Sequence, residues 1–105
     1  MMHDSPKRAV RCVRLATEDA PALSSLESRC FALPWTEQAF AEAFAGKTFH
    51  AFGIRETASP LSPRELAGYI AVYHTPDEVE ILNIAVREDR RRHGYGRLLM
   101  ATALQ

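Results

Sequence analysis

Two glycines and a nearby arginine lie where a strand is expected to lead into a helix. Gly94 and Gly96 are separated by one residue, and Arg91 precedes Gly94 by three positions. A glycine loop at a helix N-terminus presents unpaired backbone N–H groups and the positive end of the helix dipole. The spacing therefore indicates a loop that binds an anionic phosphate.

Two common phosphate loops do not match this pattern. The Walker loop requires Lys followed by Ser or Thr after its second glycine, whereas Arg97 and Leu98 follow Gly96. The dinucleotide-binding fingerprint requires Gly or Ala three residues after Gly96, and Leu99 stands there. A plain strand–helix connection with solvated arginines is the alternative interpretation. It explains the charges but not two glycines at this spacing.

Composition predicts the elements on both sides of the loop. An apolar run interrupted only by Asn83 precedes it, and such a run favours a strand that is buried on both faces. The apolar members of this run are Ile81, Leu82, Ile84, Ala85 and Val86. The segment from Arg97 to Leu104 contains good helix formers and neither Gly nor Pro, which predicts a helix.

Length and charge limit the classes of protein to consider. The chain has 105 residues and a formal net charge of zero, which suits one small domain over residues 1–105 and not a polycation that binds nucleic acid. Positive charge is local, because five arginines between residues 87 and 97 face only Glu88 and Asp89. Cys12 and Cys30 form no C-x-x-C pair, so no metal is expected. Without a membrane-spanning apolar run or a signal peptide, we expect no membrane contact and a cytoplasmic location.

The remaining elements follow from periodicity and turn residues. Strands are predicted over residues 10–16, 48–55, 66–73 and 79–86, and helices over 17–31 and 36–46 and from Arg97 onward. Thr17 and Thr36 are the predicted N-caps of the first two helices. Residues 1–8 are expected to be disordered. The order β-α-α-β-β-β-α predicts an α/β domain with a mostly antiparallel sheet.

These features together are similar to a known family. The pattern Arg91-x-x-Gly94-x-Gly96, preceded by an Ile-Ala-Val strand, resembles the acetyl-CoA pyrophosphate loop of the GCN5-related N-acetyltransferases (GNAT). The resemblance implies the N-terminal portion of the GNAT fold, acetyl-CoA as cosubstrate and acetyl transfer to an amine. The segment Pro34-Trp35-Thr36-Glu37 also resembles the loop between the first two helices of the RimI-type ribosomal-protein alanine N-acetyltransferases. Alternatively, Trp35 simply packs over the core.

The resemblance implies a role for each matching residue. The backbone of Ile84, Ala85 and Val86 would pair with the pantetheine arm of acetyl-CoA, and an N–H near Val86 would donate to the thioester oxyanion. Pro34 and Trp35 would contact the acceptor. The loop that would wrap the pyrophosphate consists of Arg91, Arg92, His93, Gly94, Tyr95, Gly96 and Arg97.

The complete fold of this family continues beyond the helix that follows the glycine loop. The resemblance implies that the tyrosine which protonates the leaving thiolate, and a glutamate proposed as base, lie in that further part. The chain is therefore expected to be truncated after this helix. The strand that ends at Val86 would then have an unpaired edge, so we expect self-association through it or marginal stability.

Glu80 is the candidate base among the residues present. A peptide α-amine has a pKa of about 8, so a carboxylate acting through water suffices to remove its proton. An exposed charge at a strand end is the alternative role for Glu80. The predicted function is acetyl transfer from acetyl-CoA to the N-terminal α-amine of a protein, of the ribosomal-protein alanine type. Acetylation of a lysine or a small-molecule amine, and a non-catalytic fragment that binds acyl-CoA, remain alternatives.

Overall fold

The computed structural model describes residues 9–105, and the expectation for residues 1–8 lies outside them. Four strands form one antiparallel sheet in the order β1-β2-β3-β4. These are β1 (Ala9–Arg14), β2 (Phe49–Thr57), β3 (Gly68–His74) and β4 (Val79–Val86). The helices are α1 (Ala20–Cys30), α2 (Glu37–Ala45) and α3 (Tyr95–Ala103), with short 3-10 helices η1 (Thr17–Asp19) and η2 (Glu88–Arg90). The predicted order β-α-α-β-β-β-α and the antiparallel sheet are confirmed.

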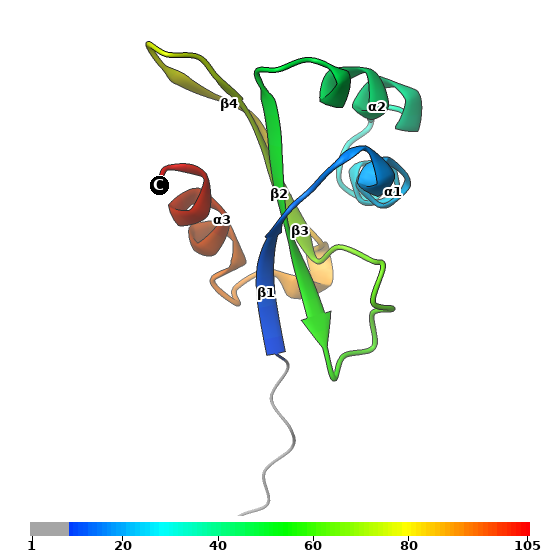
Figure 1. Ribbon diagram of the computed structural model, residues 1–105. Coiled ribbons are helices and arrows are strands. Elements are labelled where there is room, and N and C mark those ends of the chain that lie inside the picture. Colours follow the sequence, from blue (N-terminus) through cyan, green and yellow to red (C-terminus); the bar gives the residue numbers. More distant parts are fainter. Residues whose placement is uncertain (1–8) are drawn as a thin grey trace, which may run out of the picture.

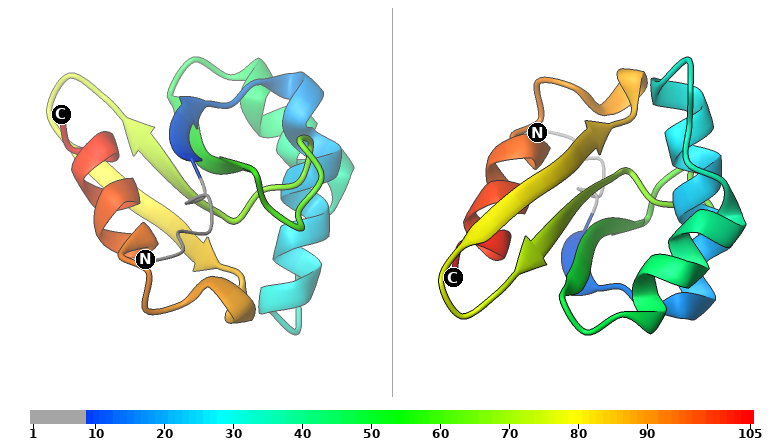
Figure 2. Two further views of the ribbon diagram at one scale, coloured as in Figure 1. Left: turned by 90° about the horizontal axis from the view of Figure 1, so that it is seen from below. Right: turned by 90° about the horizontal axis from the view of Figure 1, so that it is seen from above.

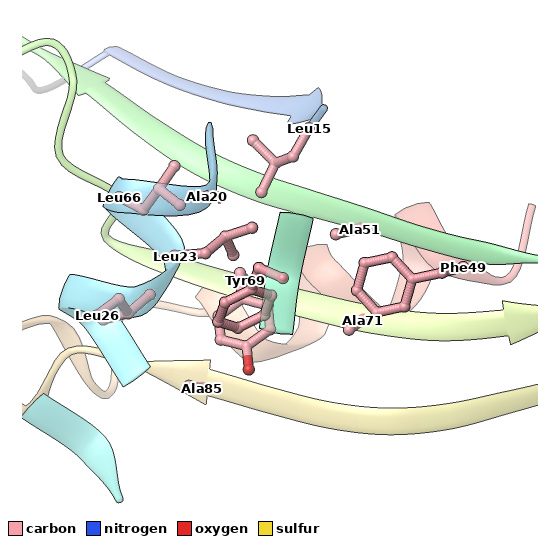
Figure 3. Close-up of a cluster of buried hydrophobic side chains, with 11 residues drawn as sticks. Leu15, Ala20, Leu23, Leu26, Phe49, Ala51, Leu66, Tyr69, Ala71 and Ala85 are labelled. Atoms are coloured by element: carbon pink, nitrogen blue, oxygen red, sulfur yellow. The ribbon is translucent and has the colours of Figure 1, made fainter. Parts of the chain in front are cut away.

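The sheet separates two layers of helices. Figure 1 shows α1 and α2 on one side of the sheet and α3 on the other, and both views in Figure 2 agree. The cluster under α1 and α2 includes Leu23 and Leu26 (Figure 3), and also Phe40; all three are at most 2% exposed. The cluster under α3 includes Ile70 and Leu99, which are fully buried. Each face of the sheet therefore has its own core, and loops at the sheet ends connect the two layers.

Local signals explain where the helices near the candidate site begin. Thr36 is the N-cap of α2, as predicted, and its Oγ1 accepts a 3.0 Å hydrogen bond from the N–H of Ala39. The prediction that Thr17 caps α1 is wrong, because residues 17–19 form η1 and α1 begins at Ala20. β1 ends at Arg14 and not at residue 16. α3 begins at Tyr95, two residues before the predicted start.

The prediction that β4 is buried on both faces is wrong for the chain as described. Ala85 is the only buried residue of β4, whereas Ile81 and Ile84 are 37% and 36% exposed. The physical reason is that β4 is an edge strand of the four-stranded sheet. Its side chains have neighbours from β3 on one side, and no further strand of the described residues flanks them on the other. The register also shifts by one residue, because Ala71 pairs with Asn83 and Val72 pairs with Ile81. Such a bulge bends the strand locally and redirects its backbone.

Candidate active site

The glycine loop forms an open helix N-terminus, as predicted. Gly94 is the N-cap residue of α3 with φ of 80°, and no side chain caps the helix. A Cβ atom built on Gly94 or on Gly96 meets nothing within 4 Å. The first N–H groups of an α-helix have no partner inside the helix, so this end of α3 has both the donors and the open space that a phosphate needs.

The loop is attached directly to the end of β4. The Nε of Arg91 donates to the carbonyl oxygen of Val86 over 3.3 Å. Arg92 has φ of 67°, in the left-handed region that non-glycine residues seldom occupy, and such conformations cost of order 1–3 kcal/mol and concentrate at ligand sites. His93 is exposed, and its ring centroid lies 5.8 Å from that of Tyr95.

Two of the five arginines between residues 87 and 97 do not belong to the basic surface. Arg87 and Arg90 are 9% and 5% exposed. Arg87 Nε donates to Asp89 Oδ1 over 3.1 Å and Arg90 Nε to Glu56 Oε2 over 2.8 Å. The predicted five-arginine patch is therefore wrong in these two members, whose charges are used inside the fold. The exposed arginines of the segment are Arg91, Arg92 and Arg97.

A buried carboxylate on β2 holds the loop at both of its ends. Glu56 has a fully buried side chain, and it accepts hydrogen bonds from Arg90, just before the loop, and from the Tyr95 hydroxyl at 2.5 Å, just after Gly94. Ser59 donates to the same carboxylate over 2.5 Å. Burial raises the pKa of Glu56, but the hydrogen bonds from Arg90, Ser59 and Tyr95 outweigh it and hold this pKa at about 2. The side chain of Tyr95 is thus engaged in the core, so a ligand would meet its backbone.

The outer edge of β4 carries backbone groups that do not pair with β3. The N–H of Ile84 donates to its neighbour Asn83 Oδ1 over 3.1 Å, and the carbonyl of Val86 accepts from Arg91. Backbone groups alternate in direction along an antiparallel strand, so Ile84 and Val86 face the free edge. Ala85 pairs with Tyr69 and is directed toward β3. Ile84 and Val86 therefore offer the edge along which an extended pantetheine arm would run.

A second buried carboxylate lies between α1 and this edge. Glu27 is 2% exposed. It accepts hydrogen bonds from the hydroxyl of Tyr69, from Asn83 Nδ2 at 3.3 Å and from the backbone N–H of Trp35 at 3.3 Å. Figure 3 shows the Tyr69 ring within the core, with its hydroxyl on the side of β4. Burial and the neighbouring Glu27 carboxylate raise the pKa of Tyr69 far above its ordinary value, so this hydroxyl stays protonated.

Trp35 packs over the core and keeps part of its surface exposed. Its ring lies 5.3 Å from Phe40 and 6.2 Å from Phe49, centroid to centroid, so it packs over the core as the alternative interpretation holds. It is also 39% exposed, and Leu33 beside it is 92% exposed. An apolar surface therefore remains available at the loop that contains Pro34 and Trp35.

Glu80 lies at the other end of β4 from the glycine loop. It is exposed and pairs in register with Tyr73. At about 3.3 Å per residue, the six steps from Glu80 to Val86 span about 20 Å. Glu80 therefore can act only on the far end of an extended ligand whose phosphates lie at Gly94.

Comparison with known proteins identifies the arrangement of strand, loop and helix. Residues 20–105 match the Acetyltransferase (GNAT) family. The chain belongs to this family. A relative from Salmonella typhimurium, named [ribosomal protein bS18]-alanine N-acetyltransferase, is 33% identical over 86 residues, which are 82% of this chain and 53% of the relative. The chain thus spans about half the length of the curated relatives it matches.

Solved structures of the family agree with the fold. The ribosomal-protein-S18-alanine N-acetyltransferase from Escherichia coli superposes with a TM-score of 0.75 at 30% identity, over 90% of this chain and 56% of that one. Arabidopsis thaliana NAA60 in complex with acetyl-CoA superposes with a TM-score of 0.69 at 16% identity, over 91% of this chain and 65% of that one. The second likeness shows a shared fold alone. In this GNAT chain, no helix within residues 9–105 has the length and apolar character needed to cross a membrane.

Sequence reasoning missed the two buried carboxylates of this GNAT chain, although each left a signal. Glu27 stands in the apolar stripe of α1, four residues after Leu23, where a carboxylate is out of place. Glu56 follows Ile54 by two residues and shares its buried side of β2. An acid at an apolar position indicates a polar network, but the sequence does not reveal the donors, which come from residues 3 to 56 positions away.

Proposed function

We propose that the protein transfers an acetyl group from acetyl-CoA to the α-amine at the N-terminus of a protein, with alanine as the first residue. The observation that carries the proposal is the open N-terminus of α3 at Gly94, joined through Arg91 to the free edge of β4 at Val86. Such a site fits the two parts of acetyl-CoA, a charged pyrophosphate and an extended arm. The names of the relatives that match 82% of this chain support the choice of acceptor.

The exposed residues of the glycine loop and the free edge of β4 have distinct roles in this proposal. Arg91, Arg92 and Arg97 are exposed around the loop and would neutralise the phosphates, with His93 beside them and with the N–H groups of Gly94 to Gly96 in direct contact. The edge of β4 would orient the thioester, and the N–H of Val86 would stabilise the oxyanion that forms when the amine attacks the carbonyl carbon.

The acceptor side involves other elements. Pro34 and Trp35 would contact the first residues of the acceptor. Glu80 lies about 20 Å along β4 from the oxyanion donor at Val86, so it is too far to take the proton of an amine that attacks a thioester held there. That proton would pass to solvent water as the new C–N bond forms and the C–S bond breaks, and the leaving thiolate would take a proton from solvent. A neutral amine is the reactive form, and a peptide α-amine needs little help because its pKa is about 8.

A transfer assay with three acceptors tests the proposal. One is a peptide with a free N-terminal alanine, the second is the same peptide with a blocked N-terminus and one internal lysine, and the third is a polyamine. We expect thiol release with the first peptide alone, accompanied by a mass increase of one acetyl group on its first residue. Transfer to the lysine or the polyamine, without transfer to the alanine peptide, would overturn the acceptor assignment. Failure to bind CoA would overturn the site itself.

A further inference from the structure

The Glu27 carboxylate connects the acceptor loop with the strand proposed to bind acetyl-CoA. Its three donors come from three separate segments: Trp35 from the α1–α2 loop, Tyr69 from β3 and Asn83 from β4. Asn83 Nδ2 also reaches Glu27 Oε2 at 3.3 Å and the Tyr69 hydroxyl at 3.1 Å. The donor from the loop is the main chain of Trp35, so this contact holds the path of the loop itself and not the side chain alone.

The connection continues to the free edge of β4. The amide of Asn83 donates to Glu27 through Nδ2 and accepts from the N–H of Ile84 through Oδ1. These two roles fix the orientation of the amide, because its donor and acceptor ends are both used. An unbroken series of hydrogen bonds thus runs from the Trp35 backbone through Glu27 and Asn83 to the backbone of Ile84.

Stability alone does not account for this arrangement. All three groups that donate to Glu27 are neutral, and a buried carboxylate without a cation keeps a large desolvation cost. A leucine in the same apolar stripe of α1 would avoid that cost. What a charged acceptor at this point does provide is one defined arrangement of the segments that donate to it.

We infer that Glu27 is a positioning residue that sets the acceptor loop against the β4 edge. The inference rests on the proposed function, because the loop is taken to bind the acceptor and the edge to bind acetyl-CoA. Without the carboxylate, the loop at Trp35 would move relative to Ile84 while the glycine loop at Gly94 stays in place. Glu27 therefore acts on the acceptor, and binding of acetyl-CoA does not depend on it.

Two substitutions and one matched control test the inference. Glu27→Gln replaces one carboxylate oxygen by an NH2 group, which cannot accept the hydrogen bonds made there. Asn83→Ala removes the link between Glu27 and Ile84. Glu42→Gln is the control, since Glu42 is exposed on α2 and bonds to Gln38 of the same helix. KM is measured separately for the acceptor and for acetyl-CoA.

We expect Glu27→Gln to raise the acceptor KM at least fivefold and to leave the acetyl-CoA KM within twofold. Asn83→Ala should also raise the acceptor KM at least fivefold, whereas Glu42→Gln changes neither KM. Trp35 is the single tryptophan of the chain, so its fluorescence reports the loop without any activity. Acrylamide should quench Trp35 more strongly in Glu27→Gln than in the control protein, because the Trp35 N–H loses its acceptor.

Each result decides the inference. Equal increases of both KM values in Glu27→Gln would overturn it. An acceptor KM and a quenching constant of Glu27→Gln that equal those of Glu42→Gln would overturn it as well. If Glu27→Gln does not fold, a folded Asn83→Ala protein with unchanged acceptor KM overturns it as well. A protein that transfers acetyl to no amine would contradict the proposed function, and the quenching comparison would still test the position of the loop.

Discussion

Glu56 predicts a defined acid sensitivity of the fold. Burial raises its pKa, but the hydrogen bonds from Arg90, Ser59 and Tyr95 outweigh burial and lower the pKa from an ordinary 4.5 to about 2. Because the pKa is lower in the folded protein than in the unfolded chain, the ionised group stabilises the folded protein above pH 4.5. This contribution is lost as the pH falls from about 4.5 toward 2. At about 1.4 kcal/mol per pKa unit, the difference between the two pKa values amounts to about 3 kcal/mol near pH 7.

The substitution Glu56→Gln isolates this contribution. At pH 7 we expect it to lower the free energy of unfolding by about 3 kcal/mol, because the buried Arg90 then lacks its opposite charge. That is a large share of the roughly 5–15 kcal/mol typical of a small domain. Between pH 6 and pH 3, about 2 kcal/mol of the difference from the unsubstituted protein should disappear, since the unfolded chain binds the proton there and the folded protein does not.

Urea unfolding of both proteins at a series of pH values measures this difference. Glu42→Gln serves as control, because an exposed carboxylate on α2 should change the free energy of unfolding by no more than about 0.5 kcal/mol at any pH. If the Glu56→Gln difference stays constant from pH 6 to pH 3, the assignment of the depressed pKa is refuted. Should Glu56→Gln not fold, Tyr95→Phe removes one donor to Glu56 and should cost about 1 kcal/mol, with a weaker pH dependence than that of the unsubstituted protein.

Three further predictions concern the glycine loop and the sheet. Gly94→Val should abolish CoA binding measured by calorimetry, because φ of 80° is strained for a branched residue and the side chain would occupy the open space; unchanged affinity in a folded variant would refute the site. The affinity for CoA should fall as salt is added, since exposed arginine charges are screened over about 8 Å at physiological ionic strength, and a salt-independent affinity would contradict a charge-based loop. Gly68→Ala should lower the midpoint of thermal unfolding, because its Cβ would lie 2.9 Å from the carbonyl oxygen of Ala85 in β4, at a cost of roughly 1–3 kcal/mol; an unaltered midpoint would show that the two strands separate without cost.

The elements with strong local signals were predictable from the sequence. The apolar run before the glycine loop predicted β4, and Thr36 predicted the start of α2, because strand propensity and N-capping act within a few residues. The early start of α3 was not predictable in this way. Gly96 is a poor helix former, yet it lies in the first turn of α3 because the buried Tyr95 is held there by Glu56. Tertiary contact overrides local propensity at this position.

Charge counted along the sequence was a weaker guide than apolar pattern. Five arginines against two acids indicated one basic surface, but Arg90 finds its partner in Glu56, which is 34 residues away. A window of eleven residues cannot contain that partner. The burial of β4 was not predictable for a similar reason. The apolar pattern of a strand does not show whether the strand lies at the centre of the sheet or at its edge.

The two missed carboxylates show how buried charge organises the candidate site. Glu56 contacts Arg90 and Tyr95 on both sides of the glycine loop, and Glu27 contacts the backbone of Trp35 and the side chain of Asn83. Neither carboxylate is exposed enough to meet a ligand, so both act through the segments that they hold. They differ in their partners, since Glu56 faces a guanidinium and Glu27 faces neutral donors. The glycine loop is therefore held by an ion pair with a buried guanidinium, whereas the loop at Trp35 depends on hydrogen bonds from neutral donors, which a single amide substitution is expected to break.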